Sequence, residues 1–168
     1  MGITEFGIKR EDEVRVAGGC AVILDPVSQK YAVLKQADNG LYRLPSGGVS
    51  PDEDIKDGVL REVREESGLH DFLHVEKIAE AIVHYHNSLK NSNRAGPATC
   101  FLVILKSTNL MPLQLEEHEN FVLEWRTADE ILSDWIARNE NKDFDHWIYF
   151  FDKSIARARE LGYGTTSA

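Results

Sequence analysis

The sequence predicts an α/β fold, in which a mixed β-sheet lies between helices as an α/β/α sandwich. Two observations favour this class. Strand patterns come first, a central helix follows them, and further strands and a terminal helix complete the chain. The 168 residues have the length of one domain, and no repeat, low-complexity tract or linker divides them. We expect a single domain over residues 1–168, with flexible ends at 1–12 and 163–168.

The first predicted strands precede the central helix. Residues 14–24 are apolar and β-branched, which predicts a buried strand, and residues 30–36 predict a second strand. The turn-forming sequence DPVSQ separates them, so the two strands are expected to form a hairpin. A loop rich in Gly, Asn and Pro then leads to the helix.

The central helix has clear start and stop signals. Ser50 suits the N-cap, Pro51 suits the first helical position, and Glu53 completes a capping box. Gly68 is placed to end the helix in a left-handed conformation. Three apolar residues recur every four positions and are expected to face the core: Ile55, Val59 and Val63.

The second half of the chain predicts three more strands and two helices. The strands are expected within 74–86, at 99–106 and at 120–126, and the helices at 128–138 and 144–161. A polar loop at 87–98 separates the first two of these strands and is long enough to be mobile.

Composition limits the partners and the compartment. The net charge of −9 argues against a nucleic-acid polymer or an anionic membrane as partner, because either would need a basic face. It permits a small phosphorylated substrate if a divalent cation bridges the two acidic partners. No apolar run reaches the ~18 residues of a membrane span, and the amino terminus has no signal-peptide core. Cys20 and Cys100 lie in apolar runs, which favours buried reduced thiols and a cytoplasmic protein.

Three glutamates of the central helix share one side of it. Glu62, Glu65 and Glu66 stand at i, i+3 and i+4, where like charges repel by roughly 0.2–0.5 kcal/mol per pair. Their position near the helix C-terminus also opposes the helix dipole. One interpretation is a solvated face with ion pairs from Arg61 and Arg64. The other is a magnesium or manganese site, because hard cations prefer oxygen ligands.

The same segment resembles the Nudix box. That motif is Gly, five residues, Glu, seven residues, Arg-Glu, an aliphatic residue, any residue, Glu-Glu, any residue, Gly and an aliphatic residue. Every specified position is filled here, by Gly47, Glu53, Arg61-Glu62-Val63, Glu65-Glu66 and Gly68-Leu69. The element order and chain length are also similar to those of the family. One departure is Ser46, where family members often have glycine.

The resemblance implies a metal-dependent hydrolase that acts on a nucleoside diphosphate linked to another group. By this likeness Mg²⁺ or Mn²⁺ would be bound by Glu62, Glu65 and Glu66, with a further oxygen from the backbone carbonyl of Ser46 or Gly47. The metal would activate a water for attack on phosphorus.

The resemblance also assigns supporting roles. Arg61 would hold a glutamate in place, with Glu65 at i+4 as the favoured partner, and Glu53 would lie in the outer shell of the metal site. The capping-box role alone also explains Glu53. The general base would be a box glutamate or an acid of a downstream loop, where the chain has Glu116, Glu117, His118 and Glu119. Among these four, a glutamate is favoured over His118.

The substrate is less defined by the sequence. A nucleoside triphosphate or a dinucleoside polyphosphate is favoured, with a nucleotide sugar or ADP-ribose as the alternative. Tyr85 lies where Nudix enzymes acting on dinucleoside polyphosphates tend to have tyrosine, and the proline expected there for ADP-ribose hydrolases is missing. Candidate substrate contacts are Arg43, Lys35, Tyr85 and Glu119. A non-catalytic nucleotide-sensing module is the competing class, and a homodimer is compatible with the family.

Overall fold

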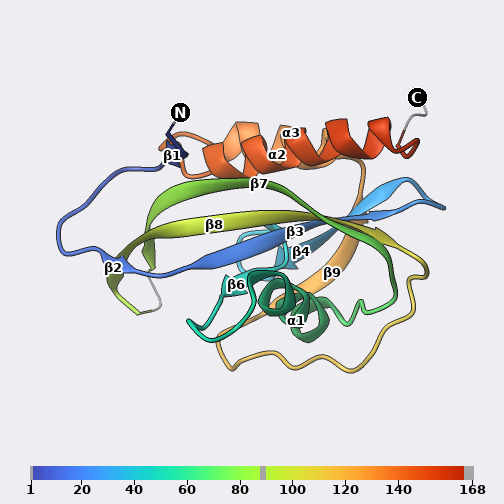
Figure 1. Ribbon diagram of the computed structural model, residues 1–168, viewed down its shortest axis with the longest axis horizontal. Coiled ribbons are helices and arrows are strands. Elements are labelled where there is room, and N and C mark those ends of the chain that lie inside the picture. Colours follow the sequence, from blue (N-terminus) through green and yellow to red (C-terminus); the bar gives the residue numbers. More distant parts are fainter. Residues whose placement is uncertain (1, 88–89, 165–168) are drawn as a thin grey trace.

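The computed structural model describes residues 2–87 and 90–164, and it confirms the α/β sandwich (Figure 1). Its helices are α1 (Ile55–Ser67), α2 (Ala128–Arg138) and α3 (Asp145–Glu160). Its strands are β1 (Thr4–Phe6), β2 (Val14–Arg15), β3 (Gly18–Asp25), β4 (Lys30–Gln36), β5 (Tyr42–Arg43), β6 (Ser46–Gly48), β7 (Phe72–Asn87), β8 (Ser92–Leu105) and β9 (Phe121–Arg126).

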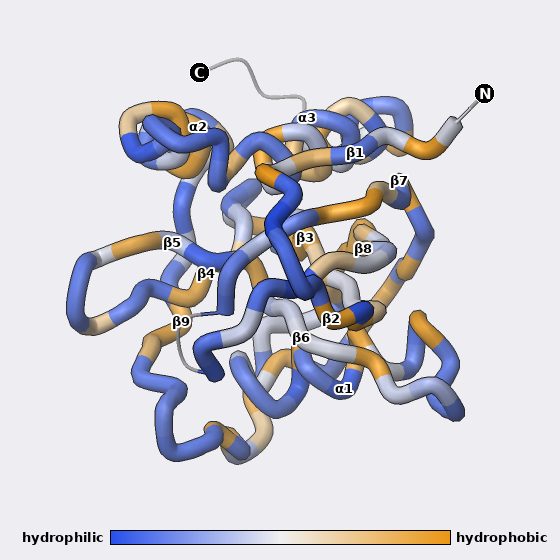
Figure 2. Tube along the Cα trace, turned by 90° about the vertical axis from the view of Figure 1, so that its left-hand side faces the viewer, coloured by the Kyte–Doolittle hydropathy of each residue, from blue (hydrophilic) through white to orange (hydrophobic). Residues whose placement is uncertain are grey.

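One mixed sheet forms the middle layer of the described chain. Its main path runs β1-β7-β8-β3-β4-β5, while β2 pairs with β8, β6 with β3, and β9 with β4. Helices α2 and α3 cover one face and α1 covers the other. Figure 2 shows the same three layers from the side of the N-terminal residues, with α1 below the strands. None of the helices in the described ranges is long and apolar enough to cross a membrane.

The alternation of side chains along β3 divides the core into two parts. Val22 and Leu24 pack toward α2 and α3, whereas Ala21 and Ile23 pack toward α1. Successive side chains of a strand point to opposite faces, so a strand covered on both faces needs an unbroken apolar run. This is why the strand at residues 18–24 could be predicted from the sequence, whereas its predicted start at residue 14 was wrong, because Val14–Arg15 form the separate, exposed strand β2.

Helix α1 closes its face of the sheet with a narrow apolar stripe. Val59 and Val63 are fully buried, as predicted, and Ile55 packs partly buried against the same cluster. Gly68 ends the helix with φ 80°, which confirms the predicted left-handed cap. The acidic residues of α1 lie beside this apolar stripe, and Glu62 and Glu66 reach strand β6 at the edge of the helix.

The polar segment 87–98 is mostly strand, so the predicted mobile loop was wrong for the described residues. β7 and β8 continue as a long antiparallel hairpin, in which Asn87 pairs with Ser92. Polar cross-strand contacts support this end of the hairpin: His86 Nδ1 lies 2.8 Å from Asn93 Oδ1. Composition alone misled the prediction, because this part of the sheet is not buried against a helix. Residues 88–89 lie outside the described residues.

The N-terminal residues pair with this hairpin. Within 1–12, which were expected to be a flexible end, β1 pairs with β7, and β2, just after these residues, pairs with β8. The His84 ring lies between two carboxylates of this segment, with Nδ1 2.8 Å from Glu13 and Nε2 3.1 Å from Glu5. Hydrogen bonds to Glu13 and then Glu5 raise the pKa of His84 above its usual value. The other predicted end, 163–168, lies mostly outside the described residues.

Candidate metal and catalytic site

Helix α1 begins later than the capping box predicts. Asp54 is the N-cap, and its side chain accepts a hydrogen bond of 3.1 Å from the Asp57 amide. The assignment of Ser50 as N-cap and Pro51 as first helical residue was therefore wrong. Ser50 and Glu53 instead close a turn before the helix: the Glu53 amide donates to the Ser50 carbonyl at 3.0 Å. Asp54 offers the same kind of capping oxygen closer to the apolar stripe.

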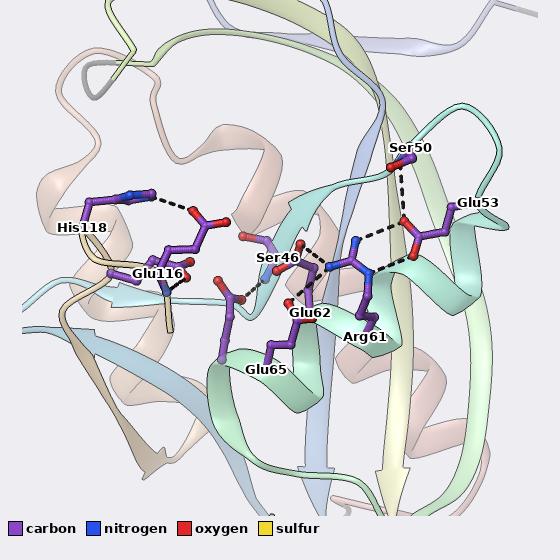
Figure 3. A network of polar contacts seen from close by, with 10 residues as sticks. Ser46, Ser50, Glu53, Arg61, Glu62, Glu65, Glu116 and His118 are labelled. Carbon is purple, nitrogen blue, oxygen red and sulfur yellow. Dashed lines mark hydrogen bonds and ion pairs between the residues drawn. The ribbon is translucent and has the colours of Figure 1, made fainter. Parts of the chain in front are cut away.

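The early turn leaves Glu53 free to reach Arg61. The Arg61 guanidinium donates two hydrogen bonds to Glu53, of 2.8 and 3.0 Å, in a bidentate pair. The same guanidinium lies 3.1 Å from Glu62 and 3.2 Å from Glu65, so it joins three carboxylates (Figure 3). Its hydrogen bonds to Glu53 lower the pKa of that carboxyl group. The predicted pair between Arg61 and Glu65 is confirmed, and Glu53 has a role beyond capping.

Glu66 turns away from solvent. Its side chain is only 3% exposed, and it accepts a 2.9 Å hydrogen bond from the Ser46 amide at the start of β6. The pKa of Glu66 is raised to about 9, chiefly by burial, with smaller contributions in the same direction from a hydrogen bond to Glu119 and the charge of Glu62. The Ser46 amide and the charge of Arg43 oppose this rise. A solvated face is therefore excluded for Glu66.

Glu62 packs over a glycine of β6. A Cβ added to Gly47 would lie 2.6 Å from Glu62 Cγ, so any side chain at that position would displace Glu62. Gly47 pairs with Gly19 in the sheet, so the backbone beneath Glu62 is fixed. Burial raises the pKa of Glu62, and the Arg61 charge opposes that rise. Gly47, the glycine of the box, thus leaves the space in which the Glu62 carboxylate packs against the sheet.

Of the acidic loop before β9, Glu119 is the residue that meets the helix glutamates. It forms a side-chain hydrogen bond to Glu66 and its charge raises the pKa of Glu62. His118 instead lies 3.4 Å from Glu116, and Figure 3 shows this pair pointing toward each other. We call Glu62, Glu65, Glu66 and Glu119 the carboxylate cluster.

The predicted substrate contacts divide between this region and other places. Arg43 stacks over the Phe121 ring at 5.6 Å, and its charge reaches Glu66, so it borders the carboxylate cluster. Lys35 is on the neighbouring strand β4, with Nζ 3.9 Å from Glu124 on β9. The aromatic support for Arg43 was not predicted, since Phe121 is far from it in sequence.

Tyr85 lies in a different part of the molecule. It is 37% exposed and borders a hollow of about 310 Å³ between the N-terminal residues, the end of β7 and the start of α3. The other residues around this hollow are Gly7, Arg10, His84, His86, Lys142, Asp143 and His146. None of them belongs to the carboxylate cluster, so the structure does not bring Tyr85 together with the other predicted site residues.

The donor set of the carboxylate cluster fits a hard divalent cation. Within the described ranges, no three acidic, histidine or cysteine side chains are already arranged to hold a metal. Arg61 occupies the oxygens of Glu62 and Glu65, and the Ser46 amide occupies one oxygen of Glu66. The oxygens nevertheless are of the kind that Mg²⁺ and Mn²⁺ prefer, and the ionised form of Glu66 lacks a full countercharge.

Two main-chain donors of the site had no signal in the sequence. The Ser46 amide binds Glu66, and the Glu116 amide binds Glu119 Oε1 at 2.8 Å. Every residue except proline has such a group, so only the fold shows which amide meets which carboxylate. For Ser46 the family resemblance implied that the carbonyl is a metal ligand. The structure adds that the Ser46 amide is a hydrogen-bond donor to Glu66.

Comparisons with known proteins agree with this geometry. The family model described as the NUDIX domain matches residues 14–148. A Nudix hydrolase from Nitrosomonas europaea is similar in structure, with TM-score 0.60 and 20% identity, covering 86% of this chain and 90% of that one. The chain belongs to the Nudix family, and it is a Nudix hydrolase.

Two further solved structures share the fold. The Nudix domain of Shewanella oneidensis NrtR, complexed with ADP ribose, has TM-score 0.59 and 17% identity, covering 89% of each chain. The Caenorhabditis elegans Ap4A hydrolase, in a binary complex, has TM-score 0.58 and 17% identity, covering 88% of this chain and 99% of that one. At these identities the likeness shows the fold alone. A search of curated proteins gave no match.

Proposed function

We propose that this Nudix hydrolase cleaves a phosphoanhydride bond in a nucleoside diphosphate linked to another group, with Mg²⁺ or Mn²⁺ as cofactor. The observation that supports it most is the carboxylate cluster around the buried Glu66. A buried carboxylate ionises at neutral pH only if a positive charge comes close to it. A divalent cation bound with a diphosphate would supply that charge and join two acidic partners.

The metal would be held by Glu62, Glu65 and Glu66, with Glu119 as the further carboxylate beside them. When bound, it would supply an activated water and charge stabilisation for the leaving phosphate. The protein's own groups do the positioning. Glu53 holds Arg61, and Arg61 in turn donates hydrogen bonds to Glu62 and Glu65.

Glu119 is the acid of the downstream loop that joins the site. It lies on a loop outside α1 and faces the cluster, whereas His118 is paired with Glu116. Arg43, held over Phe121, supplies a positive charge beside the cluster for a phosphate of the substrate, and Lys35 lies on the adjoining strand. Rates should rise on the alkaline side, because the water-derived nucleophile must be deprotonated.

Nucleoside triphosphates and dinucleoside polyphosphates are the favoured substrates. The solved relatives named for ADP ribose and Ap4A both concern nucleoside diphosphates with a second group attached, which supports the general class. A nucleotide sugar or ADP-ribose is the alternative substrate. Cys20 and Cys100 are free and buried, which is compatible with a cytoplasmic enzyme.

The test is product release from a substrate panel with Mg²⁺. The panel contains nucleoside triphosphates, dinucleoside polyphosphates, nucleotide sugars and ADP-ribose. We expect turnover of at least one class, lost in Glu65→Gln and Glu66→Gln and kept in the loop variant Glu117→Gln. If no member of the panel were turned over while one member bound tightly, the proposal of an enzyme would give way to that of a nucleotide sensor.

A further inference from the structure

The loop at 106–120, between β8 and β9, is bound along the C-terminal end of α1 by main-chain hydrogen bonds. The chain leaves β8 beside Asp71 and runs back along the end of the helix, where Leu110 pairs with Leu69. The amide-to-carbonyl bonds are Lys106 to Asp71 at 2.9 Å, Met111 to Gly68 at 2.8 Å and Gln114 to Glu65 at 2.9 Å. The position of this loop is therefore set by the helix.

The end of the helix needs these partners. The last carbonyl groups of an α-helix accept no hydrogen bond from an amide of the same helix. The carbonyl of Glu65 is one of these groups, and the Gln114 amide donates to it. The approach at Gly68 is close, because an added Cβ would lie 2.6 Å from the Met111 carbonyl oxygen. The loop thus contacts the end of α1 at Gly68, which has no side chain to keep it away, beside the helix glutamates.

The loop ends in a tight turn that orients Glu119. The Glu119 amide donates to the Glu116 carbonyl at 2.9 Å, and the Glu116 amide donates to Glu119 Oε1 at 2.8 Å. One carboxylate oxygen is therefore fixed by the main chain, and the carboxylate also bonds to Glu66. The Glu116 side chain takes no part in this, since it is 72% exposed and pairs with His118.

We propose that the Glu116 backbone amide is a positioning group, which presents Glu119 to Glu62 and Glu66 as a further oxygen donor for a divalent cation. This inference rests on the proposed function. It predicts that the affinity for the cation depends on the Glu116 N–H, which lies in the loop at 106–120 and not in helix α1. Groups that orient metal ligands typically affect affinity by 10–100-fold.

The experiment measures Mn²⁺ affinity by isothermal titration in the full chain, without substrate. Glu116→Pro removes the amide hydrogen, and Glu116→Ala keeps it while removing the side chain. We expect Glu116→Pro and Glu119→Gln each to weaken Mn²⁺ binding by about tenfold or more. The Mn²⁺ affinity of Glu116→Ala should stay within about twofold of that of the original protein. This variant is therefore the matched control for loss of the Glu116 side chain.

Glu119→Asp addresses the same amide without any change of backbone. Its carboxylate is one methylene too short to meet both the Glu116 amide and Glu66, so its affinity should fall like that of Glu119→Gln. Equal affinities in Glu116→Pro and Glu116→Ala, or original affinity in Glu119→Asp, would overturn the inference. If Glu66→Gln itself left Mn²⁺ binding unchanged, the proposed function would fail instead, which separates the two outcomes.

Discussion

Replacement of Glu66 by glutamine should change how the stability of the metal-free protein depends on pH. Glu66 is 3% exposed, and burial raises its pKa to about 9 from an ordinary value of 4.5. In the folded protein it is protonated at neutral pH, whereas in the unfolded chain it is ionised above pH 4.5. The unfolded chain thus releases a proton, and stability falls as pH rises from about 4.5 to 9.

The magnitude follows from the two pKa values. Each pH unit between them costs about 1.4 kcal/mol, so Glu66 should remove about 4 kcal/mol of unfolding free energy between pH 5 and pH 8. That is a large part of the ~5–15 kcal/mol of a typical domain. Glutamine has nearly the same shape and cannot ionise, so Glu66→Gln should lack this loss.

The assay is urea unfolding of both proteins in EDTA at pH 5 and pH 8. The difference in unfolding free energy between Glu66→Gln and the original protein should shift by about 4 kcal/mol in favour of glutamine. Contributions of groups that do not interact with Glu66 cancel in that difference. Glu117→Gln, in the exposed part of the acidic loop, should give no shift. A pH-independent difference for Glu66→Gln would refute the buried, protonated carboxyl group.

Three other changes give further predictions. Gly47→Ala should displace Glu62 and lower Mg²⁺-dependent turnover by about tenfold or more, whereas Gly48→Ala, with no atom closer than 3.8 Å to its new Cβ, should keep activity. Arg61→Lys should also lose about tenfold in turnover, because lysine cannot make the bidentate pair, while circular dichroism should show a folded protein. For His84, the raised pKa means that its two carboxylate pairs stabilise the fold below about pH 6.5, and that this stability is lost as pH rises through the folded value. An NMR titration should place that value above 6.5, and His84→Gln should remove this part of the pH dependence; a midpoint at or below 6.5 would contradict it.

Much of the site could be predicted because it is local in sequence. The glutamates of α1, the pair between Arg61 and Glu65 and the glycine that ends the helix all follow from spacing within one segment. Local signals were less reliable at the helix start, where the sequence predicted Ser50 as the N-cap and the structure has Asp54. That choice decided whether Glu53 caps the helix or holds Arg61.

The remaining contacts depend on segments that only the fold brings together. Glu119 reaches Glu66 because the loop before β9 docks on the end of α1, and Arg43 is supported by the distant Phe121. Neither contact has a periodic pattern in the sequence. Polar residues near 87–98 were also misleading, because strand pairing there depends on the partner strand more than on burial.

The most direct test of the central claim is the position of Mn²⁺ in a crystal soaked with Mn²⁺ and a non-hydrolysable nucleotide. We expect an anomalous peak bound by oxygens of Glu62, Glu65 and Glu66, with Glu119 beside it and the diphosphate on its open side. A nucleotide that binds while no peak appears at these glutamates would contradict the account.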